Sequence, residues 1–303
     1  MDGAVKYARS TKQICLVVFI DLSSAFDTVW HAGLLERLAS MGIKGKMMGL
    51  LKSYLEERSF QVFYEGEFST SRESSSGVPQ GGILSPILFN VMMSSLPKIE
   101  EIQYCEYADD IAMYITGKKP NTLVRKMQSA IDSLDKFCKS SGFIVNPGKT
   151  KAMFFTNRKV TLPQLKISEK DIKYVDEYKY LGIIIDSPKL LWKKHINYLK
   201  ERVLKRINIL KAVSGTKWGA DRATLMKLYY SLIRSRLDYG SQLYQTASKT
   251  AIGVLDPIQN QCLRIAAGCW KTSPTTALEV ECHCAPLFLH REEVSIKYIL
   301  RLL

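Results

Sequence analysis

The chain has 303 residues, 46% of them apolar, and a formal net charge of +14. This length and composition predict a globular protein of about two domains. No apolar run reaches the ~18 residues that a membrane helix requires, and Met1–Lys12 lacks the apolar stretch of a signal peptide. We therefore expect an intracellular protein with no membrane partner.

The seven cysteines are scattered and odd in number, so reduced thiols are expected rather than disulfides. The segment Cys282–His290 invites a zinc interpretation. We reject it, because Cys-x-Cys with one distant histidine lacks the two-pair spacing of structural zinc sites. His31 and His195 have no visible set of partners in the sequence.

Basic residues concentrate between Lys189 and Arg236, where thirteen Lys or Arg accompany only two acids, Glu201 and Asp221. Such a patch attracts phosphate backbones through counterion release, without reading sequence. A solvated helix face is the alternative interpretation. The residues that we expect to bind nucleic acid are Lys193, Lys194, Lys200, Arg202, Lys205 and Arg206.

The first predicted element is a strand buried on both faces, because Ile14–Ile20 is an unbroken apolar run. It ends at Asp21, which places a carboxylate at the rim of a sheet. Helical spacing follows in Leu34–Met41, with Gly42 placed to stop that helix, and again in Lys46–Glu57.

The next segments alternate between hairpins and helices. Phe60–Phe68 alternates around a Glu-Gly pair, which predicts a hairpin. Ser74–Gly82 reads as a loop and Ile83–Ser95 as an apolar helix. Tyr104–Ile115 contains two β-prone runs that flank Ala108-Asp109-Asp110. Two acids at such a tip repel each other, so we expect a cation to compensate them.

A long helix is predicted where apolar residues recur at helical spacing from Leu123 to Cys138, closed by Gly142. Phe143–Val145, Ala152–Thr156 and Tyr180–Ile185 are strand candidates. These segments give an α+β pattern.

Beyond Pro188 the pattern becomes helical. A second helix is expected to begin at Asp221 as its N-cap. The first helix has one apolar stripe made of Ile196, Leu199, Val203, Ile207 and Leu210.

Five motifs occur in a fixed order. They are FIDLSSAFD (Phe19–Asp27), GVPQGGILSPILFN (Gly77–Asn90), YADD (Tyr107–Asp110), NPGKTK (Asn146–Lys151) and YLG (Tyr180–Gly182). Together they resemble the palm of reverse transcriptases, which are RNA-directed DNA polymerases. The resemblance is greatest to the enzymes of non-LTR retrotransposons, the LINE-type elements, with the jockey-like group as the candidate subgroup.

The resemblance implies a polymerase palm, an antiparallel sheet with packed helices, in residues 1–187, together with a remnant of the fingers. An all-helical basic thumb would follow in residues 188–250 and a C-terminal helical extension in 251–303. Only about 20 residues precede Asp21, so the fingers domain is expected to be largely missing.

The resemblance also implies a catalytic centre for nucleotidyl transfer with two Mg²⁺ ions, or Mn²⁺ in their place. Asp21 and Asp109 match the principal metal ligands, helped by the carbonyl of Leu22 and supported by Asp110. Lys149 matches the general acid that protonates the leaving pyrophosphate.

Phe26 matches the aromatic steric gate that rejects a ribose 2'-hydroxyl, although a plain core phenylalanine would look the same. Asp27 is expected to be structural. The remaining assignments are a nucleotide-binding loop of Pro79, Gln80 and Gly81 and a primer grip of Tyr180, Leu181 and Gly182.

We therefore expect an RNA-directed DNA polymerase that adds dNTPs to a DNA primer on an RNA template, alongside other domains of the same element. The alternative is a truncated or decayed copy that retains only nucleic-acid binding. A related RNA-dependent RNA polymerase or intron maturase is a second enzyme alternative, against which Phe26 argues. The choice between nucleus and cytoplasm stays open.

Overall fold

The structure, a computed structural model, describes residues 1–215 and 218–301. Lys217, which belongs to the basic patch of the sequence, lies outside the described residues. Contacts divide the chain into two compact units, Gly3–Asp176 with Met1 and Glu177–Leu303 with Asp2. This division comes before the predicted boundary at residue 187. The first unit mixes sheet and helices and the second is mainly helical, so the α+β class is confirmed.

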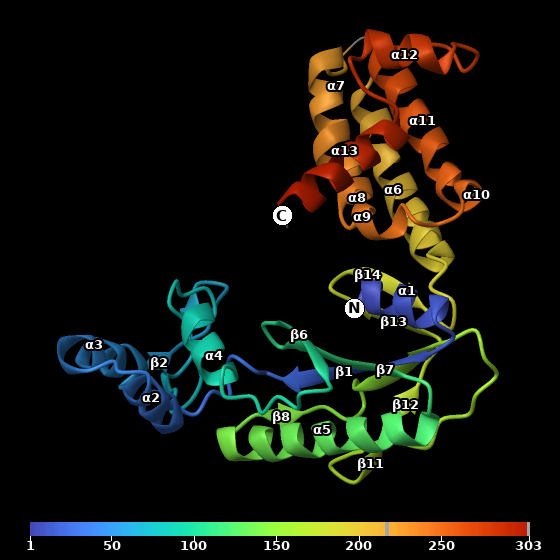
Figure 1. The fold of residues 1–303 in the computed structure, drawn as a ribbon. Helices are drawn as coiled ribbons and strands as arrows, with labels where there is room; N and C mark the ends of the chain where they lie inside the picture. Colours follow the sequence, from blue (N-terminus) through green and yellow to red (C-terminus); the bar gives the residue numbers. More distant parts are fainter. Residues whose placement is uncertain (216–217, 302–303) are drawn as a thin grey trace. The chain divides into compact units, whose positions relative to one another are not determined.

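A six-stranded sheet lies at the centre of the first unit, and β1 runs through its middle (Figure 1). The strand order is β12-β9-β1-β7-β6, and β8 pairs with the end of β1. Neighbouring strands are antiparallel except β12 and β9. The strands are β1 (Ile14–Ser23), β6 (Gln103–Tyr107), β7 (Asp110–Gly117), β8 (Ile144–Val145), β9 (Lys151–Phe155) and β12 (Lys173–Tyr174).

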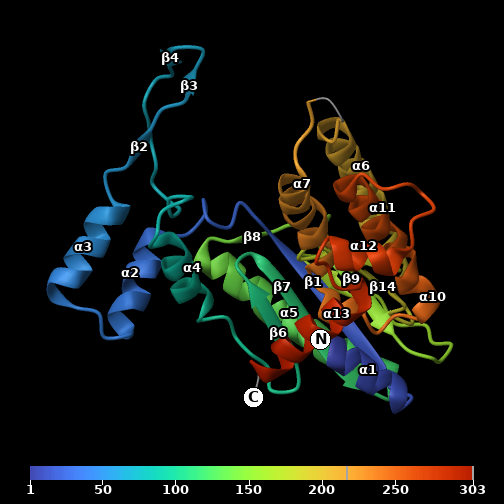
Figure 2. The same ribbon diagram turned by 90° about the horizontal axis from the view of Figure 1, so that it is seen from above.

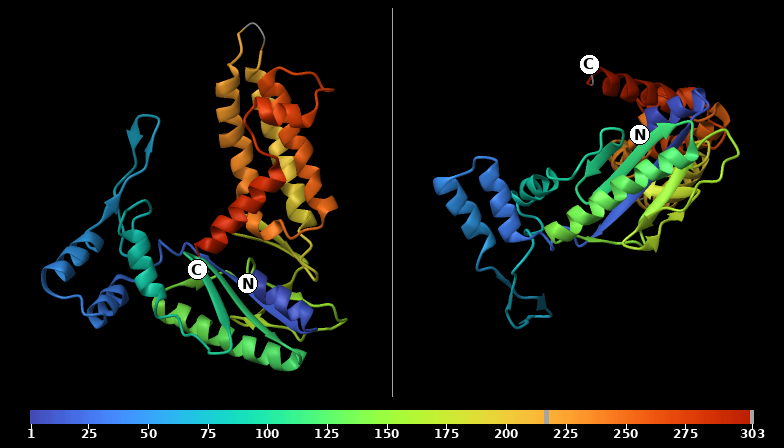
Figure 3. Two further views of the ribbon diagram at one scale, coloured as in Figure 1. Left: turned by 45° about the horizontal axis from the view of Figure 1, so that its top comes forward. Right: turned by 60° about the horizontal axis from the view of Figure 1, so that its bottom comes forward.

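The central strand is confirmed, since every residue from Ile14 to Ile20 is buried. Helix α5 (Pro120–Ser141) covers one face of the sheet (Figures 1 and 3). It starts on a proline, whose missing N–H costs a first turn nothing, and stops at Gly142, whose φ of 80° is left-handed. The predicted apolar face is buried in full: Leu123, Met127, Ile131, Leu134 and Cys138.

The rest of the first unit is made of short helices and two-stranded ribbons. Helix α2 packs against α3 and α4, and a ribbon extends away from α2 and α3 (Figure 2). The helices are α1 (Asp2–Ser10), α2 (His31–Ser40), α3 (Gly45–Leu55) and α4 (Ser85–Met93). The ribbon strands are β2 (Ser59–Phe60), β3 (Phe63–Tyr64), β4 (Glu67–Phe68) and β5 (Arg72–Glu73), and a separate hairpin joins β10 (Lys166–Ile167) to β11 (Lys170–Asp171).

The predicted turn of the ribbon is confirmed at Glu65 and Gly66, whose φ values are 49° and 91°. Two successive positive φ values match the right-handed twist of the flanking strands.

The second unit begins with a hairpin, β13 (Glu177–Tyr180) and β14 (Ile183–Asp186). The prediction of one strand over Tyr180–Ile185 is therefore wrong. Leu181 and Gly182 have φ values of 46° and 80°, so they form a two-residue turn and Tyr180 pairs with Ile183. The hydroxyl of Tyr239 donates to the Leu181 carbonyl at 2.7 Å, which holds a leucine in a conformation that it rarely adopts.

Helices make up the remainder of this unit, with α6 against α7 and α11 (Figures 1 and 2). The stripe predicted from Ile196 to Leu210 is buried, and Asp221 caps α7 by accepting from the Thr224 amide at 2.8 Å. The helices are α6 (Lys193–Val213), α7 (Arg222–Tyr229), the π-helical turn η1 (Tyr230–Arg234), α8 (Ser235–Asp238), α9 (Ser241–Tyr244), α10 (Lys249–Ile252), the 3-10 turn η2 (Gly253–Leu255), α11 (Asp256–Ala267), α12 (Thr275–Glu281) and α13 (Leu287–Leu300).

Each of the seven cysteines is a free thiol. Burial raises the pKa of Cys15, Cys138 and Cys262 to about 12, so these thiols keep their protons at neutral pH and act as small apolar side chains. Within the described ranges, none of the helices is long and apolar enough to span a bilayer.

Candidate active site

Two carboxylates lie opposite each other where the buried part of the sheet ends. Asp21 of β1 is the register partner of Asp110, the first residue of β7. Opposite residues of an antiparallel pair project from the same face with Cβ atoms about 4.5–5.5 Å apart. Both side chains are half-buried. The ladder thus brings together two motifs that are far apart in the chain.

Asp109 occupies the tip of the β6–β7 hairpin, whose turn consists of Ala108 and Asp109. Ala108 has a φ of 51°, which closes the tight turn, and the Asp109 side chain is exposed. The predicted hairpin with carboxylates at its tip is therefore confirmed. The structure places Asp110, rather than the predicted principal ligand Asp109, in register with Asp21.

The electrostatics of this site favour a bound cation. Burial, followed by the negative charges of Asp109 and Asp21, raises the pKa of Asp110 above its ordinary value. The Oδ2 atom of Asp21 is buried and has no hydrogen-bond partner. The Lys149 ammonium is 3.7 Å from that oxygen, which allows attraction but is too long for a hydrogen bond.

A complete metal cage is not preformed. Among the described residues, no group of three or more His, Cys, Asp or Glu side chains is arranged to hold an ion. Mg²⁺ nevertheless prefers oxygen, and it is commonly held by one or two carboxylates together with water and substrate phosphates. The unpartnered oxygen of Asp21 and the neighbouring Asp110 carboxylate fit that donor set.

Lys149 reaches Asp21 because the preceding turn is fastened to β1. The Asn146 amide donates to the Asp21 carbonyl at 2.8 Å, and the Lys149 amide donates to the Asn146 side-chain oxygen at 3.2 Å. Leu22, whose carbonyl was predicted to assist the metal, pairs with Val145 in the β1–β8 ladder. These contacts give the NPGKTK motif a structural role, which is to hold Lys149 beside Asp21.

The predicted gate and nucleotide-binding loop also meet. The half-buried ring of Phe26 stacks on Phe89 with centroids 4.6 Å apart, and its carbonyl accepts from the Val78 amide at 2.7 Å. The Pro79 carbonyl accepts from the Ser85 hydroxyl at 2.5 Å, which ties the loop to the start of α4. Phe26 is therefore partly a packing residue and partly a neighbour of the loop.

Gln80 is exposed, and its Nε2 donates to the Asp27 carboxylate at 3.0 Å. Gly81 follows with a φ of 88°. Asp27, Pro79 and Gln80 help to line a cavity of about 580 Å³. The ring of His31, for which the sequence indicated no partner, makes a 2.7 Å hydrogen bond with the Gly77 carbonyl. No spacing rule could have found this contact, because the two residues lie on separate segments.

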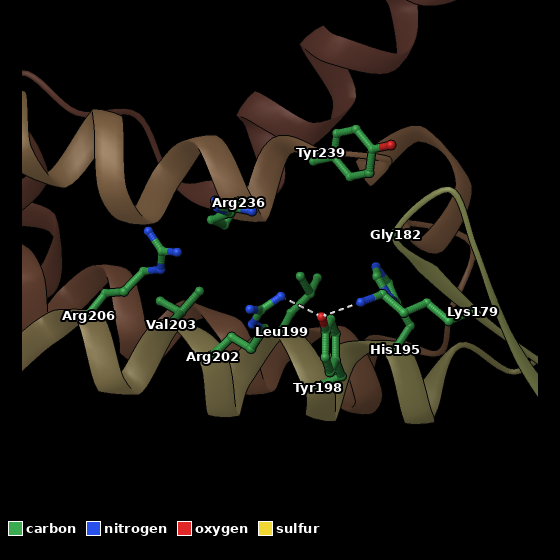
Figure 4. A pocket seen from close by; sticks show the side chains of 10 residues that line it. All are labelled: Lys179, Gly182, His195, Tyr198, Leu199, Arg202, Val203, Arg206, Arg236 and Tyr239. Atoms are coloured by element: carbon green, nitrogen blue, oxygen red, sulfur yellow. Dashed lines mark hydrogen bonds between the residues drawn. The ribbon is translucent and has the colours of Figure 1, made fainter. Parts of the chain in front are cut away.

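A basic cavity lies in the second unit, between α6 and the residues around α8 (Figure 4). Its volume is about 260 Å³. Four cationic side chains line it, and the ten lining residues, all of them described, include no acid. They are Lys179, Gly182, His195, Tyr198, Leu199, Arg202, Val203, Arg206, Arg236 and Tyr239.

A tyrosine organises two of the cations. The Tyr198 hydroxyl accepts from Lys179 at 3.0 Å and from Arg202 at 2.6 Å, and Figure 4 shows these side chains approaching it from either side. The hydrogen bond from Lys179, and then that from Arg202, lowers the pKa of Tyr198. Both groups also lie near the Tyr198 ring.

His195 lies at the buried base of this cavity. Its Nδ1 accepts from the Ile184 amide at 3.2 Å, so the other ring nitrogen carries the proton of the neutral ring. Burial lowers the pKa of His195 to about 4. The ring is therefore uncharged at neutral pH.

Of the six residues predicted to bind nucleic acid, only Arg202 and Arg206 line the cavity. The other four are exposed on α6, and one of them, Lys194, pairs with Glu177 at 2.8 Å. The sequence did not indicate that four other residues join Arg202 and Arg206 in this cavity. They are Lys179, Tyr198, Arg236 and Tyr239. The primer-grip residues lie at the β13–β14 turn, and Gly182 belongs to the cavity wall.

The sequence matches a known protein family. The family model described as reverse transcriptase (RNA-dependent DNA polymerase) matches residues 1–185. The chain is 27% identical, over 97% of its length, to an RNA-directed DNA polymerase from mobile element jockey of Drosophila melanogaster. It is 30% identical, over 86% of its length, to a probable RNA-directed DNA polymerase from transposon BS of the same species.

The chain spans about a third of the length of these curated relatives, 33% for jockey and 30% for BS. A solved structure of apo telomerase from Candida tropicalis has a TM-score of 0.48 at 15% identity, over 88% of this chain and 44% of that one. The predicted similarity to the polymerases of jockey-like elements is thereby confirmed.

Proposed function

Because the chain belongs to the reverse transcriptase (RNA-dependent DNA polymerase) family, we propose that its first unit is a polymerase palm that adds deoxynucleotides to a primer 3' end on an RNA template. One observation carries the proposal. Asp21 is in register with Asp110 and keeps a buried oxygen that accepts no hydrogen bond and lies 3.7 Å from the Lys149 ammonium.

The protein residues have distinct parts in this reaction. Divalent ions, Mg²⁺ or Mn²⁺, would activate the primer hydroxyl and stabilise the leaving group. Asp21 and Asp109 would be their principal ligands, helped by the carbonyl of Leu22. Asp110, which is in register with Asp21, would support them. Lys149 stands beside Asp21, where its ammonium can neutralise or protonate the departing pyrophosphate. Phe26 and the loop around Gln80 would contact the incoming nucleotide.

The second unit would act as the thumb, with the β13–β14 turn as primer grip. The basic cavity supports this assignment, since four cations without an acidic neighbour attract backbone phosphates. The exposed lysines of α6 would add further electrostatic attraction. RNA template, DNA primer and dNTP are the partners that this arrangement implies.

The decisive experiment is dTTP incorporation on poly(rA) primed with oligo(dT) in Mg²⁺, comparing Asp21→Asn with Asp171→Asn. The first change removes a metal-binding charge, and we expect a loss of about a thousandfold, which corresponds to ~4 kcal/mol of activation free energy. The second removes an exposed carboxylate of β11 in the same unit and should leave the rate unchanged. Equal rates in the two variants would refute the catalytic assignment.

A binding protein without polymerase activity is the second candidate. The basic cavity supports this candidate, because its four cations can attract phosphates whether or not the carboxylates of the first unit are catalytic. Salt-sensitive binding of primer–template by a chain that incorporates no dTTP with Mg²⁺ or Mn²⁺ would select this function.

A further inference from the structure

The loop that carries Gln80 is fastened to the segment that carries Phe26. Main-chain and hydroxyl groups of Ser76, Gly77 and Val78 each donate one hydrogen bond to that segment. These run from the Val78 amide to the Phe26 carbonyl (2.7 Å), from the Gly77 amide to the Val29 carbonyl (2.8 Å) and from the Ser76 hydroxyl to the Asp27 carbonyl (3.1 Å).

The two segments touch most closely at Asp27. A Cβ atom on Gly77 would lie 2.7 Å from the Asp27 carbonyl oxygen and 2.8 Å from its Cα, so only glycine permits this approach. Gly77 also has a φ of 85°, which disfavours any other residue. The backbone of the loop is thus fixed relative to Asp27, and this contact brings Gln80 within reach of the Asp27 side chain.

The side-chain contact between them has a direction. A glutamine amide has a donating NH₂ end and an accepting carbonyl end of nearly the same shape. An ionised aspartate can only accept, so the NH₂ end of Gln80 must be the one that faces Asp27 at 3.0 Å. The Oε1 atom is therefore turned away from the carboxylate. Because both side chains are exposed, this hydrogen bond adds little to stability, and its main effect is on orientation.

We propose that Asp27 is a positioning residue, which orients the Gln80 amide so that the incoming nucleotide meets a hydrogen-bond acceptor. The inference rests on the proposed polymerase function. An acceptor fits the 3'-hydroxyl, which is the hydrogen-bond donor of a deoxyribose, and it gains nothing from a sugar that lacks this group. Asp27 thereby contributes to the preference for nucleotides with a free 3'-hydroxyl without touching them.

The test is Asp27→Asn, which keeps the size of the side chain but can both donate and accept. The Gln80 amide then loses its fixed orientation, while the glycine contact with the backbone stays. For dTTP on poly(rA)·oligo(dT) we expect KM to rise about fivefold, the value of one hydrogen bond, with kcat within about twofold. The preference for dTTP over its 3'-deoxy analogue should fall by about the same factor.

Two controls separate positioning from a general role in the fold. Asp171→Asn removes an exposed carboxylate of β11 in the same unit and leaves the loop and its hydrogen bonds in place, so KM should not change. In a Gln80→Ala background, Asp27→Asn should have no further effect, because no amide remains to be oriented.

The outcomes distinguish the two proposals. If Asp27→Asn leaves KM and the 3'-hydroxyl preference unchanged, or has the same effect with and without Gln80, the positioning role is wrong while the polymerase function stands. If the unsubstituted chain with primer–template neither incorporates dTTP nor binds it in Ca²⁺, the polymerase function itself fails and this inference with it.

Discussion

The carboxylate site of the first unit and the basic cavity of the second are opposite in charge and differ in construction. Asp21 and Asp110 are held by the register of two buried strands, which cannot slip without repacking the close-packed side chains around them. The cavity is lined instead by long side chains such as Lys179 and Arg202, which a phenol hydroxyl brings together.

This difference matches two kinds of task. Chemistry at a reacting atom depends on geometry, so a site built on strand register should fail with a single substitution. Attraction of a phosphate backbone sums over many weakly coupled charges, so a site built from flexible cations should weaken in steps. Burial affects both sites and disfavours charge in each, raising the pKa of Asp110 and lowering that of His195.

The largest effect expected on stability concerns His195. Its pKa of about 4 in the folded protein is below the ordinary value of about 6.5, so the unfolded chain takes up the proton first as the pH falls. The free energy of unfolding should be highest above about pH 6.5, fall by ~3 kcal/mol as the pH decreases to 4 and then stay constant. Urea unfolding followed by Trp192 fluorescence measures this, since that buried ring is a neighbour of His195.

The control for this prediction is a variant that cannot titrate at this position. His195→Asn retains an acceptor for the Ile184 amide but does not titrate, so it should flatten the pH profile of stability. A profile identical to that of the unsubstituted chain would show that burial of His195 does not govern the pH dependence of stability.

A smaller effect is expected when the cavity loses two of its cations. Arg202→Ala with Arg206→Ala should weaken binding of primer–template by about 30-fold at ~0.1 M salt and lower the slope of log K against log salt by about 2. Fluorescence anisotropy over a salt series measures both quantities. The Asp21→Asn variant should bind primer–template with nearly unchanged affinity. This result would separate the function of the carboxylate site from that of the basic cavity.

The matched control is Lys271→Ala, since Lys271 is exposed in the same unit and does not line the cavity. Trp218→Ala is a second control, because Trp218 is exposed in the same unit and carries no charge. A loss of affinity in Lys271→Ala comparable to that of the arginine variant, with no loss in Trp218→Ala, would show that net charge rather than the cavity governs binding.

The smallest effect is expected at the N-cap of α7. Asp221→Ala removes the acceptor of the Thr224 amide and should lower the free energy of unfolding slightly. The urea midpoint measures the change, and Asp221→Ser should restore most of it. Incorporation of dTTP should be unaffected below the transition, because the cap serves the fold of the second unit only. A loss of dTTP incorporation while the Asp221→Ala variant is still fully folded would show that α7 contributes to the reaction and not only to stability.

Much of the architecture could be predicted because its signals are local. The buried run before Asp21 determined β1, the 3.6-residue period determined α5 up to Gly142, and two β-prone runs around Asp109 determined a hairpin. The segment Tyr180–Ile185, wrongly predicted as one strand, is apolar enough for a strand. Its turn forms at a leucine held by Tyr239, a contact that no local pattern contains.

The candidate site was predictable only in part. The motifs identified Asp21, Asp109, Asp110 and Lys149, and their catalytic roles stay predictions. The partnership of Gln80 with Asp27, that of His31 with Gly77, and the assembly of four cations around Tyr198 could not be read from spacing. Each joins residues from separate elements, and a side chain's partner depends on how those elements pack.

The sequence by itself determined which chemical groups this protein has and where its central strand and long helices lie, because periodicity, turn residues and charge act over a few residues. Only the tertiary structure decided that Asp110 rather than Asp109 is in register with Asp21, and that Lys149 stands beside Asp21. Strand register and loop attachment set those distances. Both depend on hydrogen bonds between segments whose separation along the chain carries no information about their separation in space.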